Sequence, residues 1–345
     1  MKSRNAAAAV AAALLLAGAA PAQEAKPVRV LATTTDLAAL VREVGGDAVS
    51  VDCLTTGPED PHFLDARPSF VRAAHDADLF VKVGMDLEAG YEVPIVRDAR
   101  NPRIQPGAAG HCDASAAVDR LEVPTGAVDR SLGDVHPQGN PHYLTDPVRA
   151  KAVAGTIAES LGRVDPARAA RYRDAAAAFS RRADEAMFGG AILSEVPARR
   201  LERLLARGEL GSWLKEKGLE GKIGGFARAL LPFSGTEVVQ YHAHFTYLLD
   251  RFHIRVAANL EPKPGIPPSP GHVRTVVEAI RAARAPAILR TCFNPPSVPD
   301  AVAGETGARV VVLSHMPGAV GEDADYLSFV ERNVRLLAAA LGAPR

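Results

Sequence analysis

Short hydrophobic segments alternate with amphipathic helical segments along most of the chain. The segments with strand character are rich in β-branched residues and lie at positions 28–32, 49–54, 79–83, 238–241, 255–258, 287–289 and 310–313. Between them, apolar residues recur at the spacings of three and four that are typical of helices packed on one face. Regular alternation of strands and helices favours parallel sheets covered by helices. We therefore predict an α/β protein.

One helical segment near the middle of the chain is longer than the others. Asp165 is a predicted N-cap residue, and Pro166 fits the first helical position. The run to Met187 contains no glycine and no further proline, and its apolar residues form one predicted buried face: Tyr172, Ala176, Phe179, Ala183 and Met187. At 1.5 Å per residue such a helix is about 33 Å long.

Strand-bearing segments lie on both sides of this helix. We therefore predict two lobes, each with a parallel sheet and flanking helices, joined by one long helix. The predicted N-terminal lobe covers residues 23–163, the linking helix residues 164–188, and the C-terminal lobe residues 189–345.

The first 22 residues predict a cleavable signal peptide. Lys2 and Arg4 form a basic start, residues 6–20 are apolar, and Ala20 and Ala22 fit the positions that a signal peptidase reads, with cleavage before Gln23. No cysteine lies at the cleavage point, which argues against a lipid anchor. We expect a soluble protein of the periplasm.

Composition and charge exclude several classes of protein. Hydrophobic residues make up 47% of the chain and charged residues 23%, which is the balance of a folded globular protein rather than of a disordered one. Lys and Arg together number 40, as do Asp and Glu, so the basic excess of a nucleic-acid binder is missing. Three cysteines are too few for a disulfide scaffold. Either Cys53 and Cys112 form a disulfide and leave Cys292 free, or all three are free thiols; their spacing fits no metal motif.

Several histidines and one glutamate follow predicted strands or precede a predicted helix. In parallel sheets the loops after the strands converge on one edge, where ligands bind. Side chains from both halves of the chain should therefore meet between the two lobes. Imidazole and carboxylate ligands suit zinc and are also acceptable to manganese or iron. The candidates are His62, His142, His242, Glu261 and His315.

The remaining histidines have other predicted roles. Four are structural residues in helices, at a helix start or in a loop: His75, His253, His272 and His111. If a helix begins after His242, the ring of His244 points to a different face from that of His242. His136 is six residues before His142 and is either an additional ligand or a residue that captures the ion transiently.

Four motifs in the chain resemble those of one family, the solute-binding proteins of zinc and manganese ABC importers (the ZnuA/TroA type). They cover residues 57–62, 139–147, 241–252 and 261–272, in the family's order and over essentially the whole mature chain. The resemblance implies two α/β lobes joined by a rigid helix, with one metal ion in the cleft between them. It also implies delivery of the ion to an inner-membrane permease driven by a cytoplasmic ATPase.

The resemblance carries over to His62, His142 and His242 as ligands. The fourth position departs from the pattern, because many members have an Asp just after the last strand, where this chain has Ser314 beside His315. Other members use a Glu at the position of Glu261. We predict Glu261 as the fourth ligand, with His315 or a water molecule as the alternative. Three imidazoles favour Zn²⁺ over Mn²⁺ or Fe²⁺, and Asp60 and Asp65 are predicted to orient the rings.

The predicted function is that of a monomeric periplasmic receptor for a divalent metal, without enzymatic activity and without a nucleic-acid partner. One alternative is a zinc-dependent hydrolase, which needs an open coordination position and a general base; the chain has no His-Glu-x-x-His pattern. The other alternative is a surface adhesin of the same fold, for which the leader lacks an anchoring cysteine.

Overall fold

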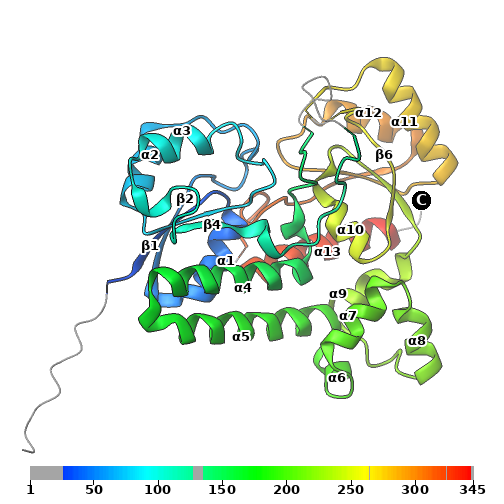
Figure 1. Ribbon diagram of the computed structural model, residues 1–345. Coiled ribbons are helices and arrows are strands. Elements are labelled where there is room, and N and C mark those ends of the chain that lie inside the picture. The colour runs from blue at the N-terminus through cyan, green and yellow to red at the C-terminus, as the bar shows by residue number, and fades with distance from the viewer. Residues whose placement is uncertain (1–25, 127–134, 264, 324, 343–345) are drawn as a thin grey trace, which may run out of the picture.

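The computed structural model describes residues 26–126, 135–263, 265–323 and 325–342. The predicted signal peptide, residues 1–22, lies outside these residues. Two α/β lobes lie next to each other, and a pair of long helices runs beneath them (Figure 1). Within the described ranges, no helix combines the length and the apolar character needed to cross a membrane.

The N-terminal lobe contains a parallel sheet of four strands in the order β2-β1-β3-β4. The strands are β1 (Val28–Ala32), β2 (Val49–Cys53), β3 (Leu79–Lys82) and β4 (His111–Asp113). The first three confirm the predicted segments to within a residue. The edge strand β4 was not predicted because only one of its three residues, Cys112, is apolar. The loop assignment of His111 is therefore wrong: this residue pairs with Phe80 of β3.

The C-terminal lobe repeats this arrangement. Its parallel sheet has the order β6-β5-β7-β8, with strands β5 (Glu237–Gln240), β6 (Arg255–Asn259), β7 (Ala287–Arg290) and β8 (Arg309–Val312). All four were predicted to within a residue. In both sheets the first strand has neighbours on both sides, so the chain leaves it in one direction and later returns on the other. Such a point in a parallel sheet is where a ligand crevice opens.

Helices cover both sheets. In chain order they are α1 (Thr35–Gly45), α2 (Pro68–Asp76), α3 (Glu92–Asp98), α4 (Pro147–Val164), α5 (Ala169–Phe188), α6 (Gly190–Leu193), α7 (Ala198–Ala206), α8 (Leu210–Lys217), α9 (Gly225–Leu230), α10 (Thr246–Arg251), α11 (Pro270–Ala283), α12 (Ser297–Thr306) and α13 (Tyr326–Gly342). The helical positions predicted for His75 and His272 are confirmed, in α2 and at the start of α11. His253 instead lies in the turn after α10 with a φ of 56°, so its helical assignment is wrong.

The long predicted helix is α5, preceded by a 3₁₀ turn at Pro166–Arg168. Its five predicted buried residues are all buried. Asp165 occupies the N-cap position of the 3₁₀ turn and Pro166 its first position, as predicted, but the Asp165 side chain makes no capping bond: its carboxylate accepts hydrogen bonds from the Tyr172 hydroxyl, at 2.6 Å, and from Arg168. Helix α5 packs along α4 and contacts α1 at one end and α9 at the other (Figure 1). The two lobes are thus linked by a hairpin of α4 and α5 rather than by one helix. The predicted lobe boundaries, between residues 163 and 164 and between residues 188 and 189, stay a prediction.

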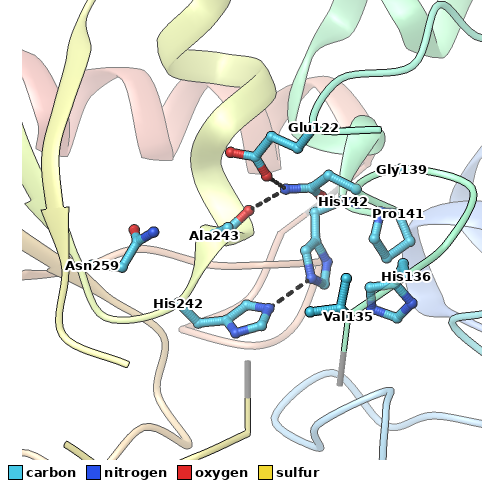
Figure 2. A pocket seen from close by; sticks show the side chains of 10 residues that line it. Glu122, Val135, His136, Gly139, Pro141, His142, His242, Ala243 and Asn259 are labelled. Atoms are coloured by element: carbon cyan, nitrogen blue, oxygen red, sulfur yellow. Dashed lines mark hydrogen bonds between the residues drawn. The ribbon is translucent and has the colours of Figure 1, made fainter. Parts of the chain in front are cut away.

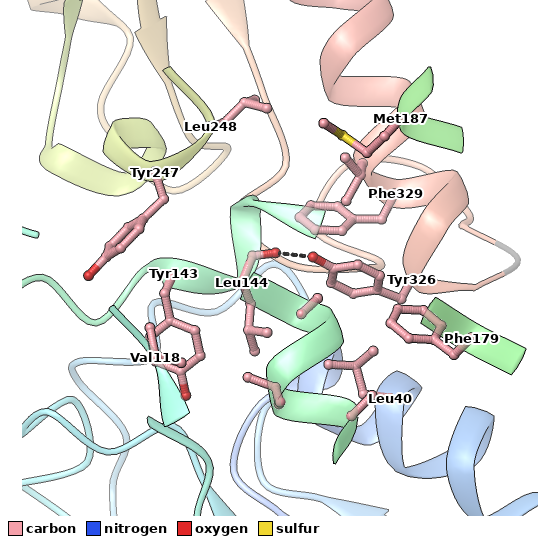
Figure 3. Close-up of a cluster of buried hydrophobic side chains, with 14 of the residues drawn as sticks. Leu40, Val118, Tyr143, Leu144, Phe179, Met187, Tyr247, Leu248, Tyr326 and Phe329 are labelled. Atoms are coloured by element: carbon pink, nitrogen blue, oxygen red, sulfur yellow. Dashed lines mark hydrogen bonds between the residues drawn. The ribbon is translucent and has the colours of Figure 1, made fainter. Parts of the chain in front are cut away.

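The strands divide their side chains between an inner and an outer core. In β1, Val30 and Ala32 point to the inner core and Leu31 to the outer one; in β5, Val238 points inward and Val239 outward. The inner core is one continuous cluster that includes side chains of both lobes. Figure 3 shows part of it, where the Tyr326 hydroxyl donates to the carbonyl of Leu144 over 2.7 Å. The two lobes therefore share one interior.

All three cysteines are free thiols. Of the two predicted alternatives, the Cys53–Cys112 disulfide is therefore wrong. Burial raises the pKa of both thiols to about 11, so they stay protonated at neutral pH and are poor nucleophiles and metal ligands.

Candidate metal centre

Three predicted ligands, His62, His142 and His242, come together between the lobes. Each offers a ring nitrogen, and these nitrogens all lie within 4.8 Å of one another. The ring centroids are 5.0 to 5.4 Å apart, and Nε2 of His142 lies 3.3 Å from Nε2 of His242. Two nitrogens on one tetrahedral zinc ion are separated by about 3.3 Å, given zinc–nitrogen bonds of about 2.0–2.1 Å. This pair is already spaced for a shared ion.

Each of the three histidines comes from a different part of the fold. His62 lies in the loop after β2, and His142 in the turn that precedes α4. His242 comes two residues after β5, the central strand at which the chain direction changes in the second sheet. The cluster therefore forms only when both lobes are folded and in contact.

A carboxylate fixes the ring of His62. Oδ1 of Asp60 accepts hydrogen bonds from the backbone N–H of His62, at 3.0 Å, and from its Nδ1, at 2.7 Å. Burial of Asp60 opposes ionisation, but the bonds from His62 outweigh it and lower the pKa of the carboxyl group. Nε2 of His62 is buried and has no hydrogen-bond partner among the described residues, so it can bind an ion. Asp65 was predicted to share this role but is exposed.

Glu261 lies behind His242. Its Oε2 accepts a hydrogen bond of 2.8 Å from Nδ1 of His242, and a second one from the backbone N–H of Gly265. The nitrogen that contacts His142 is the other one, Nε2. In the described residues, the group of possible metal ligands contains the three histidines and not Glu261. The assignment of Glu261 as the fourth ligand stays a prediction.

Hydrogen bonds also join the segments that carry His142 and His242. Nδ2 of Asn140 donates to the carbonyl of Ala243, at 2.8 Å, and to Glu122, at 2.7 Å (Figure 2). The hydroxyl of Tyr247 donates to the carbonyl of Asn140 over 2.7 Å. Asn140 and Tyr247 belong to the sequence motifs, whereas the sequence offered no signal for Glu122. These bonds hold the two histidines at a fixed separation across the lobes.

Three further histidines lie against this cluster. His136 is at the pocket wall with its ring 5.3 Å from that of His62 (Figure 2). The ring of His244 is 4.3 Å from that of His242, so the prediction that the two rings point to different faces is wrong. A 3₁₀ turn, Ala243–Phe245, does begin after His242, but His242 itself has an extended backbone, with φ −126° and ψ 161°, so a helical spacing does not relate the two rings. The ring centroid of His315 lies 6.0 Å from that of His244, and Nε2 of His315 forms a hydrogen bond with the carbonyl of Glu59.

Burial keeps several of these imidazoles neutral. Removal from water, reinforced by the neighbouring histidines, lowers the pKa of His142 and His244 well below the ordinary value. Burial likewise lowers the pKa of His136 to about 3 and that of His315 to about 4. A neutral imidazole is the form that binds a metal ion, so His142 can bind one at neutral pH without first losing a proton.

Two lobes with parallel sheets and a buried set of imidazoles between them define a metal-binding solute receptor. The comparison with known families agrees with this class. The chain belongs to the family of the zinc-uptake complex component A, periplasmic, which it matches over residues 30–200 and 226–340. This is a family of receptors for ABC metal importers and not a family of enzymes.

Individual relatives differ in the ion that their names record. The chain is 23% identical over 331 residues to the iron-binding protein YfeA of Yersinia pestis, covering 93% of this chain and 89% of that protein. It superimposes on a ZnuA deletion mutant with zinc bound, with a TM-score of 0.68, 19% identity and coverage of 93% and 100% of the two chains. The laminin-binding protein Lmb of Streptococcus agalactiae, described as both adhesin and metal transporter, gives a TM-score of 0.65, 23% identity and coverage of 92% and 100%.

Proposed function

We propose that this receptor captures zinc and that His62, His142 and His242 hold the ion. The observation that supports this most directly is the convergence of three buried ring nitrogens from both lobes within 4.8 Å. Nitrogen ligands of intermediate softness suit Zn²⁺, whereas Mn²⁺ favours carboxylate and carbonyl oxygens. The pairs His62–Asp60 and His242–Glu261 match the way zinc-binding histidines usually donate their second nitrogen to a carboxylate.

In this proposal the mature protein works in the periplasm as a monomer, after removal of residues 1–22. It delivers the ion to an inner-membrane ABC permease that a cytoplasmic ATPase drives. The pocket lined by His136, His142 and His242 gives the ion a route to the cluster. His136, whose Nε2 is buried without a partner in the described residues, is placed to meet the ion on the way.

The first prediction concerns His142→Ala. Zinc binds the folded state only, so it stabilises the parent by RT ln(1 + [L]/Kd), about 4 kcal/mol at free zinc 1,000 times above Kd. We expect His142→Ala to lose most of this stabilisation, because a central ligand is missing. The measurement is thermal unfolding with buffered free zinc and with a chelator, together with competition for zinc against a chromophoric chelator.

His75→Gln is the matched control. His75 lies in α2 and bonds to the carbonyl of Ala99, away from the cluster, so this variant should keep the full zinc-induced shift. Full retention of the shift by His62→Ala, His142→Ala and His242→Ala alike would show that zinc does not bind at this cluster.

A further inference from the structure

His244 has a side chain that the fold does not satisfy. It is 2% exposed, and in the described part of the chain neither Nδ1 nor Nε2 has a hydrogen-bond partner. A buried polar group without a partner costs about 1–3 kcal/mol, and such groups in native structures call for a bound water, an ion or another explanation. If His244 had no ligand, an apolar side chain of similar shape at this position would leave the free energy of folding nearly unchanged or make it more favourable. The position of His244 therefore points to a ligand.

The surroundings of His244 identify the kind of ligand. Its ring lies 4.3 Å from the ring of His242, 4.4 Å from that of His142 and 6.1 Å from that of His62. On the other side are the apolar ring of Phe293, at 5.4 Å, and His315. Imidazole rings that lie this close to one another can share one cation. Two imidazoles on one tetrahedral ion have centroids about 5 Å apart, a value within the range observed here.

We propose that His244 is the fourth protein ligand of the ion held by His62, His142 and His242, so that the site is made of four imidazoles. This inference rests on the proposed function and specifies the coordination of its site. In the structure, His244 lies outside the group of nitrogens within 4.8 Å of one another. Binding would therefore bring its ring toward His62, away from Phe293.

The charges around the cluster show why no carboxylate ligand is needed. Asp60 and Glu261 each accept a hydrogen bond from the outer nitrogen of one ligand, His62 or His242. The two carboxylates thus place two negative charges near an ion with two positive charges, each separated from the ion by one imidazole ring. The ion is neutralised through its ligands, while the bonds to the ion itself come from nitrogen only. An all-nitrogen shell of this kind selects Zn²⁺ strongly against Mn²⁺, which prefers oxygen ligands.

His244→Phe tests this role, because phenylalanine fills a similar volume beside Phe293 and removes both unpartnered nitrogens. Loss of an outer partner of a ligand costs about 10–100-fold in metal affinity, and loss of a ligand should cost more. We expect His244→Phe to weaken zinc binding more than about 100-fold and manganese binding much less. With a chelator present, the variant should melt at or above the temperature of the parent, because it removes a buried unsatisfied group.

X-ray absorption spectra of the zinc-loaded proteins give a second measurement. We expect four imidazole ligands in the parent and three in His244→Phe. Three imidazoles and an oxygen in the parent, or unchanged zinc affinity in His244→Phe, would overturn the role of His244. In either case His142→Ala would still abolish binding, so the proposed function would stand. If His142→Ala binds zinc like the parent, the proposed function itself fails.

Discussion

Asp60 and Glu261 each accept a hydrogen bond from Nδ1 of a histidine, at 2.7 and 2.8 Å. A carboxylate at neutral pH can only accept, so Nδ1 carries the proton in both His62 and His242. The lone pair is then on Nε2, the nitrogen that faces the other rings. At the scale of single residues, these two bonds fix the tautomers of His62 and His242 in the form that can bind an ion.

Glu261→Gln tests this preparation. Glutamine can still accept the bond from His242 but has no charge, so we expect zinc affinity to fall about 10–100-fold while the number of imidazole ligands stays the same. Zinc competition and X-ray absorption measure the two quantities. Asp65→Asn, at an exposed position of the same loop as Asp60, is the control and should bind like the parent. Loss of an oxygen ligand in Glu261→Gln would instead support Glu261 as the ligand that the sequence predicts.

The sequence predicted some residues of the site and not others, for a physical reason. His62, His142 and His242 could be found because each lies next to a strand end or a helix start with a rigid proline or a tyrosine beside it. The proximity of His244 was missed because a helical spacing was assumed for both residues, whereas His242 has an extended backbone just before the 3₁₀ turn Ala243–Phe245 that carries His244. Hydrogen bonds such as that between Glu122 and Asn140 join residues far apart in the chain and leave no local pattern.

At the scale of elements, Asp146 joins the start of α4 to the opposite lobe. Its carboxylate is fully buried, caps the helix through the backbone N–H of Val148 at 3.0 Å, and accepts from Arg149 at 2.7 Å. Arg251, the last residue of α10 in the C-terminal lobe, donates to the same carboxylate at 2.6 Å. Helices α4 and α10 follow His142 and His242 closely, so this ion pair helps to fix the distance between the two histidines.

Asp146→Asn should destabilise the protein by about 3–5 kcal/mol, because it leaves two guanidinium groups in the interior without their common anion. Urea unfolding measures the change. Asp98→Asn breaks an ion pair with Arg97 at the exposed surface and should leave the stability nearly unchanged. Equal stability of Asp146→Asn and the parent would mean that the buried pair has no net effect on folding.

Strands and helices could be predicted where their apolar residues form a continuous run or recur at a regular spacing. The strands β1, β3 and β7 each contain only one polar residue, and the buried face of α5 repeats over its whole length. Strand β4 has no such pattern, because Cys112 is its only apolar residue and its position depends on backbone pairing with β3. The pairing of α5 with α4 is a tertiary contact, which the spacing within one helix does not reveal.

At the scale of the whole molecule, the hairpin of α4 and α5 and the common inner core restrict the motion of the two lobes. Helix α5 contacts α1 below the first sheet and α9 and α13 below the second. Opening the lobes widely would expose apolar side chains such as Tyr326 and Phe329, both fully buried now. Binding and release of the ion should therefore depend on the loops around the site.

Small-angle scattering tests this restriction. A compact chain of this size has a radius of gyration of about 20 Å. We expect the value to change by less than about 1 Å between chelator-treated and zinc-loaded protein, because pre-organised partners move little on binding. The inactive variant His142→Ala, treated identically, corrects for effects of zinc on the solution. A large compaction of the parent on zinc binding would contradict the rigid link.

The shared interior also determines how the protein unfolds and how proteases attack it. Since the inner faces of both sheets are covered by the same set of side chains, neither half can melt while the other survives. An ion bound between the lobes would then stabilise the whole shared core, including segments far from any histidine. Because cleavage of transiently opened chains follows the population of the open form, we expect metal-loaded protein to resist proteases longer than metal-free protein.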